Sequence, residues 1–130
     1  MAGDTQHTRK MLIVDDSRLA RLMIRRSVEK YYPNWEITEA INADDATFRA
    51  PGIALDIITL DMNMPGQDGL SFAPSLRKMH PEAKIALLTA NIQPAVQKRA
   101  KELGLYFIPK PIKPERLLPF LQLVANIKTT

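Results

Sequence analysis

Four short, almost continuously apolar runs recur along this chain and constrain its fold more than any other feature. They are KMLIVDD, ALDIITLD, AKIALLTA and LYFIPK, which start at Lys10, Ala54, Ala83 and Leu105. Strands buried on both faces have this pattern, and they occur in parallel sheets that are covered by helices on both sides. A fifth run, WEITEAI from Trp35, alternates between polar and apolar residues and predicts another strand.

A segment with apolar residues at helical spacing follows each of the five runs. The predicted helices cover residues 17–32, 42–50, 69–80, 93–104 and 113–127. Pro74 and Pro119 fall inside two of them, where the missing N–H group is expected to kink the helix or delay its start. The alternation predicts an α/β fold, a doubly wound five-stranded parallel sheet with five helices on its two faces.

The first predicted helix has a clear apolar stripe. Ser17 or Asp16 is expected to cap its start, and Pro33 follows its end. The residues at helical spacing, which we expect to face the core, are Ala20, Met23, Ile24, Val28 and Tyr31.

The length of 130 residues indicates one domain. We expect a flexible tail over residues 1–9 and a folded domain over residues 10–130. The chain has no cysteine, so disulfides and thiol chemistry are excluded. The amino terminus lacks the apolar stretch of a signal peptide, and no run is long enough for a membrane span. A cytoplasmic protein without a membrane partner is therefore expected.

The net charge of +4 raises the possibility of nucleic-acid binding. The basic residues are spread over several segments, however, and no aromatic residues interleave with them as a base-stacking platform requires. We therefore predict no nucleic-acid partner. His7 and His80 stand alone in polar contexts, and both are expected to be solvated.

Polar side chains stand where the predicted strands end: Asp15, Asp16, Asp61, Thr89 and Lys110. In open α/β sheets, sites form at the carboxyl ends of the strands, so these groups are expected to converge. Gathered carboxylates repel one another unless a cation lies among them, and oxygen ligands favour a hard ion such as Mg²⁺. A metal, a lysine and a carboxylate at one point can carry out phosphoryl transfer, with the carboxylate as nucleophile.

The motifs LIVDDS, ITLDMNMPGQDGL, ALLTA and PKP follow one another in this chain. In this order and spacing, the sequence resembles response-regulator receiver domains, specifically the CheY-like type that stands alone in chemotaxis. The resemblance extends from about Lys10 to Ile127. It implies a flavodoxin-like fold with strand order 2-1-3-4-5.

The resemblance also implies a role for each acidic residue at the strand ends. Asp61 would accept the phosphoryl group. Asp16 and Asp61 would bind Mg²⁺ directly together with the backbone carbonyl of Asn63, and Asp15 would bind it through water. Asn63 and Asn91 would flank the path of the attacking water and tune the rate of dephosphorylation.

Three further residues would form the conformational switch of the family. Lys110 would pair with the phosphoryl group, and Thr89 would supply a hydroxyl that moves toward it. Phe107 stands where the family commonly has a tyrosine, with Tyr106 expected on the other face of its strand. The bond between Lys110 and Pro111 matches a peptide that is commonly cis in this family, so the resemblance implies a cis bond there; the cis form costs little before proline.

Two surfaces are candidates for partner binding. Arg18, Leu19 and Leu22 lie off the core stripe of the first helix and match the family's docking surface for a histidine kinase or phosphotransfer protein. Simple partial burial of the two leucines is the alternative. Residues 93–127 would form the surface that switches and binds an output partner. Three cations there favour a partner with an acidic segment: Lys98, Arg99 and Lys101.

The last predicted helix has more apolar residues than one face needs, which indicates either an exposed binding strip or a fully buried helix. As a whole, the sequence predicts a phosphoacceptor module that is a monomer or weak homodimer and not an enzyme on other substrates. A receiver cut from a larger regulator and a degenerate scaffold remain alternatives. An aspartyl-phosphate phosphohydrolase is also considered, but it lacks a second acid two residues after Asp61, where Asn63 stands.

Overall fold

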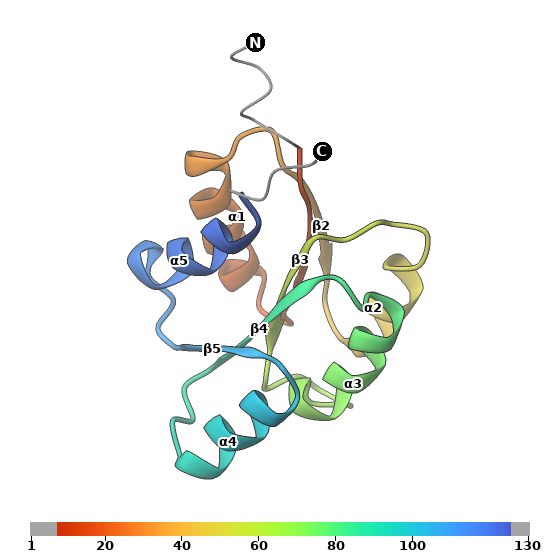
Figure 1. Cartoon of the computed structure of the whole chain (residues 1–130), viewed down its shortest axis with the longest axis vertical. Helices are drawn as coiled ribbons and strands as arrows, with labels where there is room; N and C mark the ends of the chain where they lie inside the picture. Colours follow the sequence, from red (N-terminus) through yellow and green to blue (C-terminus); the bar gives the residue numbers. More distant parts are fainter. Residues whose placement is uncertain (1–7, 126–130) are drawn as a thin grey trace.

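The computed structural model describes residues 8–125, in which five strands alternate with five helices (Figure 1). The strands are β1 (Lys10–Val14), β2 (Glu36–Ala40), β3 (Ile57–Asp61), β4 (Lys84–Thr89) and β5 (Tyr106–Pro109). The helices are α1 (Arg18–Tyr31), α2 (Ala43–Arg49), α3 (Gly69–Met79), α4 (Pro94–Glu102) and α5 (Pro114–Ala125).

The strands form one parallel sheet in the order β2-β1-β3-β4-β5, which confirms the predicted fold class and strand order. Helices α1 and α5 lie on one face of the sheet, and α2 and α3 lie on the other (Figure 1). Along β1, Met11 and Ile13 belong to the core beneath α1 and α5, whereas Leu12 and Val14 belong to the opposite core. Successive residues of a strand point to opposite faces, so a strand covered on both sides must be apolar throughout.

The helix boundaries follow local signals in the sequence. Of the two candidate caps of α1, Ser17 is the one that caps: its Oγ accepts a hydrogen bond from the Ala20 amide at 3.1 Å. Pro74 and Pro119 lie inside α3 and α5, and neither ends its helix nor delays its start. Both prolines are exposed, and water can bind the carbonyl groups that they leave free.

The predicted core stripe of α1 is only partly correct. Ile24 and Val28 are buried, but Met23 and Tyr31 have exposed fractions of 50% and 39%. Adjacent positions on a helix are rotated by about 100° from each other, so Met23 points away from the direction of Ile24. The stripe is therefore narrower than the sequence predicts.

β1 begins at Lys10, the first residue of the predicted domain, and the structure describes two residues before it. Residues 1–7 of the predicted tail lie outside the described residues, as do residues 126–130, which include Ile127. Arg9 is buried, and its carbonyl accepts a hydrogen bond from the Glu36 amide at 2.9 Å. Among residues 8–125, none of the helices combines the length and the apolar character that a membrane span requires.

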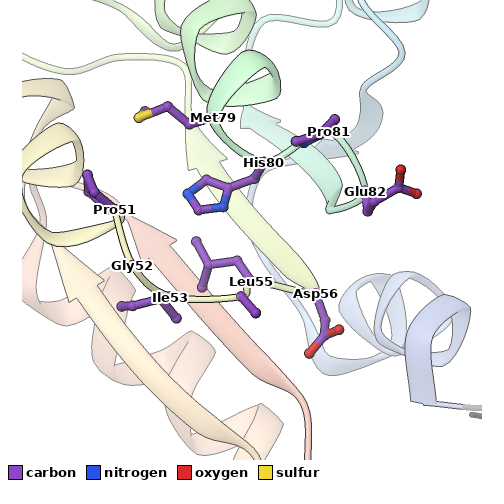
Figure 2. A pocket seen from close by; sticks show the side chains of 10 residues that line it. Pro51, Gly52, Ile53, Leu55, Asp56, Met79, His80, Pro81 and Glu82 are labelled. Carbon is purple, nitrogen blue, oxygen red and sulfur yellow. The ribbon is translucent and has the colours of Figure 1, made fainter.

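The prediction that His80 is solvated is wrong, because its side chain is buried. The residue ends α3, and its amide donates to the Leu76 carbonyl at 2.9 Å. Its ring points into a pocket between the segments 51–56 and 79–82, close to Leu55 (Figure 2). The Nε2 atom is buried without a hydrogen-bond partner in the described part of the chain. This burial lowers the pKa of His80 below its usual value.

Acidification is therefore expected to destabilise the domain through His80. Because the pKa of His80 is lowered in the folded state, the unfolded chain takes up a proton first as the pH falls through about 6.5, and stability decreases. Urea unfolding at about pH 7.5 and about pH 5.5 measures the effect when the wild type is compared with His80→Asn, which cannot titrate. An equal pH dependence in the two proteins would contradict this prediction.

Candidate functional site

The carboxyl ends of four strands bring the predicted site residues together. Asp15 directly follows β1, Asp61 and Thr89 end β3 and β4, and Lys110 directly follows β5. The strand register pairs Asp61 with Leu88, and the Lys110 amide donates to the Thr89 carbonyl at 2.9 Å. The strands thus end at nearly the same level, and the polar residues meet at one edge.

Lys110 and Asp61 form the central contact of this edge. The Nζ atom of Lys110 donates to Oδ1 of Asp61 at 2.8 Å. The Asp61 side chain is 2% exposed, whereas that of Lys110 is 30% exposed. The carboxylate is therefore held from the solvent side by a cation that remains accessible to a second anion.

Three carboxylates gather around this contact. Asp15, Asp16 and Asp61 each offer an oxygen atom within 4.8 Å of the other two. Asp15 accepts a hydrogen bond from the Ser17 amide on Oδ1 at 2.8 Å, while its Oδ2 is buried without a partner within residues 8–125. Buried polar atoms are rarely left unpaired. Both this orphaned oxygen and the all-oxygen donor set fit a hard cation such as Mg²⁺.

The ionisation of Asp15 and Asp61 is costly when no cation is bound. Burial, together with the charges of Asp61 and Asp16, raises the pKa of Asp15 to about 6, against the lowering effect of the Ser17 amide and Lys110. Burial also raises the pKa of Asp61, although Lys110 opposes the shift. A cation among the carboxylates offsets both effects, because it favours the charged forms.

The two asparagines lie beside the site, as their positions predict. The Asn63 amide donates to Oδ1 of Asp61 at 3.4 Å, and the Asn91 amide donates to the Thr89 hydroxyl oxygen at 3.0 Å. The Thr89 side chain is fully buried. Its oxygen already accepts one hydrogen bond, so its hydrogen is available to donate to an acceptor at the site.

Gly69 is a site residue that the sequence analysis missed. Its amide donates to the Met62 carbonyl at 2.8 Å. A Cβ atom added at Gly69 would lie 2.5 Å from the Asp61 carbonyl oxygen and 3.0 Å from the Met62 Cα. Only glycine permits this close approach of α3 to the end of β3. The glycine is visible in the motif PGQDGL, but nothing local reveals which backbone it contacts.

The aromatic residues of β5 lie on opposite faces, as predicted. Phe107 is half-buried against the core that contains Leu87 and Ala100, whereas the ring of Tyr106 lies 5.5 Å from that of Phe120 on α5. The Lys110–Pro111 bond is cis, which confirms that prediction. The movement of Phe107 as a switch remains a prediction.

The predicted docking residues of α1 lie on the surface. Leu19 and Leu22 are 65% and 39% exposed, and Arg18 is exposed as well. Their binding to a partner remains a prediction. On α4, the three predicted cations are also exposed: Lys98, Arg99 and Lys101.

The apolar residues of α5 mostly serve the core. Four of them are buried, which leaves little of the predicted binding strip: Leu117, Phe120, Leu121 and Val124. Leu123 is 37% exposed and lies with Tyr106 at a small pocket between β5 and α5. For α5, burial is therefore the better supported of the two alternatives.

Comparison with known proteins agrees with this geometry. The sequence model of the family described as "Response regulator receiver domain" matches residues 11–122. The chain is 34% identical to the chemotaxis protein CheY of Listeria monocytogenes over 123 residues, which covers 90% of this chain and 98% of that protein. It is also 34% identical over 110 residues to the cyclic di-GMP phosphodiesterase response regulator RpfG of Xanthomonas campestris. That match covers 82% of this chain but only 29% of the longer relative.

A solved structure shares the fold over almost its whole length. The chemotaxis response regulator CheY4 of Vibrio cholerae superposes with a TM-score of 0.80 at 30% identity, covering 91% of this chain and 99% of that one. The edge of the sheet where Asp15, Asp16 and Asp61 meet Lys110 is called the acidic edge below. The fold, this acidic edge and the sequence matches agree with one another. The chain therefore belongs to the response regulator receiver domain family and is CheY-like.

Proposed function

We propose that this chain is the phosphoacceptor of a two-component system and receives a phosphoryl group on Asp61 from a histidine kinase or phosphotransfer protein. The arrangement of Asp15, Asp16 and Asp61 around the Lys110 contact carries this proposal. A carboxylate oxygen of Asp61 forms the new bond to phosphorus. The bond between phosphorus and the donor's imidazole nitrogen breaks, and its electron pair stays on that nitrogen.

Mg²⁺ would be held by Asp15, Asp16, Asp61 and the Asn63 carbonyl, where it would neutralise charge on the transferring group. Lys110 already contacts Asp61 at 2.8 Å, and its accessible ammonium can bind an oxygen of the incoming phosphoryl group. Thr89 can donate its free hydroxyl hydrogen to another oxygen of that group. Asn63 lies beside Asp61 and Asn91 lies beside Thr89, and we propose that these two asparagines set the rate of dephosphorylation.

Phosphorylation is proposed to shift the populations of two surface conformations. A movement of Thr89 toward the site vacates space on the side where Phe107 packs, so the surface of α4, β5 and α5 is the one expected to change. An output partner with acidic groups would find three exposed cations there: Lys98, Arg99 and Lys101. We propose that the phosphodonor docks beside Arg18, Leu19 and Leu22.

The proposed biological setting is a chemotaxis-like signalling pathway in the cytoplasm. The chain covers nearly the whole length of the Listeria CheY, which supports a chemotaxis-like role. The match to RpfG covers only 29% of that protein, so receiver domains of this kind also occur within longer proteins. A receiver from a larger regulator is therefore the second candidate.

Removal of the divalent cation is expected to prevent phosphorylation. Acetyl phosphate with Mg²⁺ should give one phosphoryl adduct in intact-mass measurements, and EDTA should abolish it, since the gathered carboxylates would otherwise repel the phosphate. An excess of Mg²⁺ over EDTA serves as the control and should restore the adduct. An absence of adduct with every donor, histidine kinases included, would favour the scaffold alternative.

A further inference from the structure

Arg21 connects the acidic edge to the surface of α1. Its Nη1 donates to the Asp15 carbonyl oxygen at 2.8 Å, and its Nε donates to Oε1 of Glu39 on β2 at 2.8 Å. The Arg21 side chain is only 13% exposed. The guanidinium therefore links Glu39, on the edge strand β2, to the carbonyl of the peptide between Asp15 and Asp16.

Glu39 is itself held from two sides. Its other oxygen, Oε2, accepts a hydrogen bond from Nε of Arg25 at 2.8 Å. Although partial burial acts in the opposite direction, Arg25 and Arg21 together keep the pKa of Glu39 below its usual value. The carboxylate is therefore ionised at neutral pH and fixes the orientation of the Arg21 fork.

The carbonyl that Arg21 binds lies at the end of the sheet hydrogen bonding. The Asp15 amide donates to the Ala40 carbonyl at 3.0 Å, and from there the chain turns into the Ser17 cap of α1. This carbonyl belongs to the peptide that joins Asp15 to Asp16. Rotation of that peptide moves both carboxylates relative to Asp61, whose own position is set by β3.

From this geometry we infer that Arg21 is a positioning residue that sets the Mg²⁺ affinity of the acidic edge by fixing the Asp15–Asp16 peptide. The inference rests on the proposed function, because it assumes that Asp15, Asp16 and Asp61 bind Mg²⁺. Arg21 acts through the backbone and does not contact the ion. Residues that orient metal ligands from outside the coordination sphere commonly influence affinity by about 10–100-fold.

Electrostatic repulsion alone predicts the opposite effect of Arg21 on the Mg²⁺ affinity. Arg21 is a cation near three carboxylates, and removing it should favour the binding of another cation. If positioning dominates, Arg21→Gln weakens Mg²⁺ binding, although the variant has one positive charge less. The direction of the change therefore separates positioning from simple electrostatics.

Amide NMR titration with Mg²⁺ tests the inference without relying on phosphorylation. For Arg21→Gln we expect an affinity about tenfold lower than that of the wild type. Arg21→Lys keeps the charge but cannot bind Glu39 and the Asp15 carbonyl in the same fork, so it should be intermediate. Arg26→Gln is the matched control, since Arg26 is exposed on the same helix and carries the same charge. It should keep the wild-type affinity or bind slightly more tightly.

Glu39→Gln extends the test to the residue that orients Arg21. It should weaken Mg²⁺ binding less than Arg21→Gln does, and the double variant should bind no more weakly than Arg21→Gln alone. Thermal unfolding without Mg²⁺ confirms that each variant is folded.

Two different outcomes would overturn two different statements. Unchanged or tighter binding by folded Arg21→Gln would overturn the inference and leave the proposed function intact. A wild-type chain that shows no saturable shifts with Mg²⁺ would instead contradict the metal site of the proposed function.

Discussion

Asp61→Asn is expected to eliminate the phosphoryl adduct completely. An amide cannot act as the nucleophile that the Asp61 carboxylate supplies. Its oxygen can still accept the hydrogen bond that Lys110 donates at 2.8 Å, so the local geometry is preserved. Incubation of the wild type and the variant with acetyl phosphate and Mg²⁺, followed by intact-mass measurement, checks this result.

The same variant should not be destabilised in the absence of Mg²⁺. Because burial raises the pKa of Asp61, the charged form is disfavoured in the folded state, and a neutral amide also removes repulsion from Asp15 and Asp16. We expect a free energy of unfolding in urea that equals or exceeds the wild-type value.

The matched control for both measurements is Asp44→Asn, which changes an exposed acid at the start of α2. It should keep the adduct. An adduct that survives in Asp61→Asn but disappears in another aspartate variant would show that the acceptor has been assigned wrongly.

Gly69→Ala is expected to damage both stability and phosphorylation. The added Cβ would lie 2.5 Å from the Asp61 carbonyl oxygen, and this contact is with backbone that cannot rotate away as a side chain can. Overpacking of this kind costs about 1–3 kcal/mol. Relief requires α3 or the end of β3 to move, which would displace Asp61 from Lys110. Urea unfolding and the initial rate of phosphorylation measure the two effects.

Gly66→Ala, in the loop that leads into α3, separates the close approach at Gly69 from a general effect of glycine substitution nearby. Gly66 has a φ of +82°, so alanine is strained there, but a Cβ would meet nothing within 4 Å. This variant should lose stability and keep a nearly normal phosphorylation rate. If Gly69→Ala also kept the normal rate, the packing of α3 against Asp61 would be unimportant for the site.

Much of the fold was predictable because the determinants are local. Continuous apolar runs mark strands covered on both faces, and Ser17 caps the start of α1, as expected of one of its two candidate caps. The sequence was less informative about α1, where Met23 matches the helical period but points to solvent. The width of a buried stripe depends on the neighbouring elements that cover it.

His80 shows the same limit for a polar residue. Its neighbours in sequence, Met79 and Pro81, do not reveal that its ring points into a pocket that the segment 51–56 also lines (Figure 2). A histidine in a polar stretch is usually solvated, so no local signal predicts this burial. The pocket is lined by segments that are distant along the chain, and only the packed structure contains it.

By itself, the sequence determined the α/β architecture and which polar side chains end the strands, since the apolar runs and the residues after them are properties of the chain. The tertiary structure alone decided how these groups meet. Parallel pairing brings the ends of β1, β3, β4 and β5 to one edge, with Lys110 at 2.8 Å from Asp61. It also placed Gly69 against the Asp61 backbone and Arg21 between Glu39 and Asp15. These contacts depend on the register and separation of elements far apart in sequence, which local residue patterns do not specify.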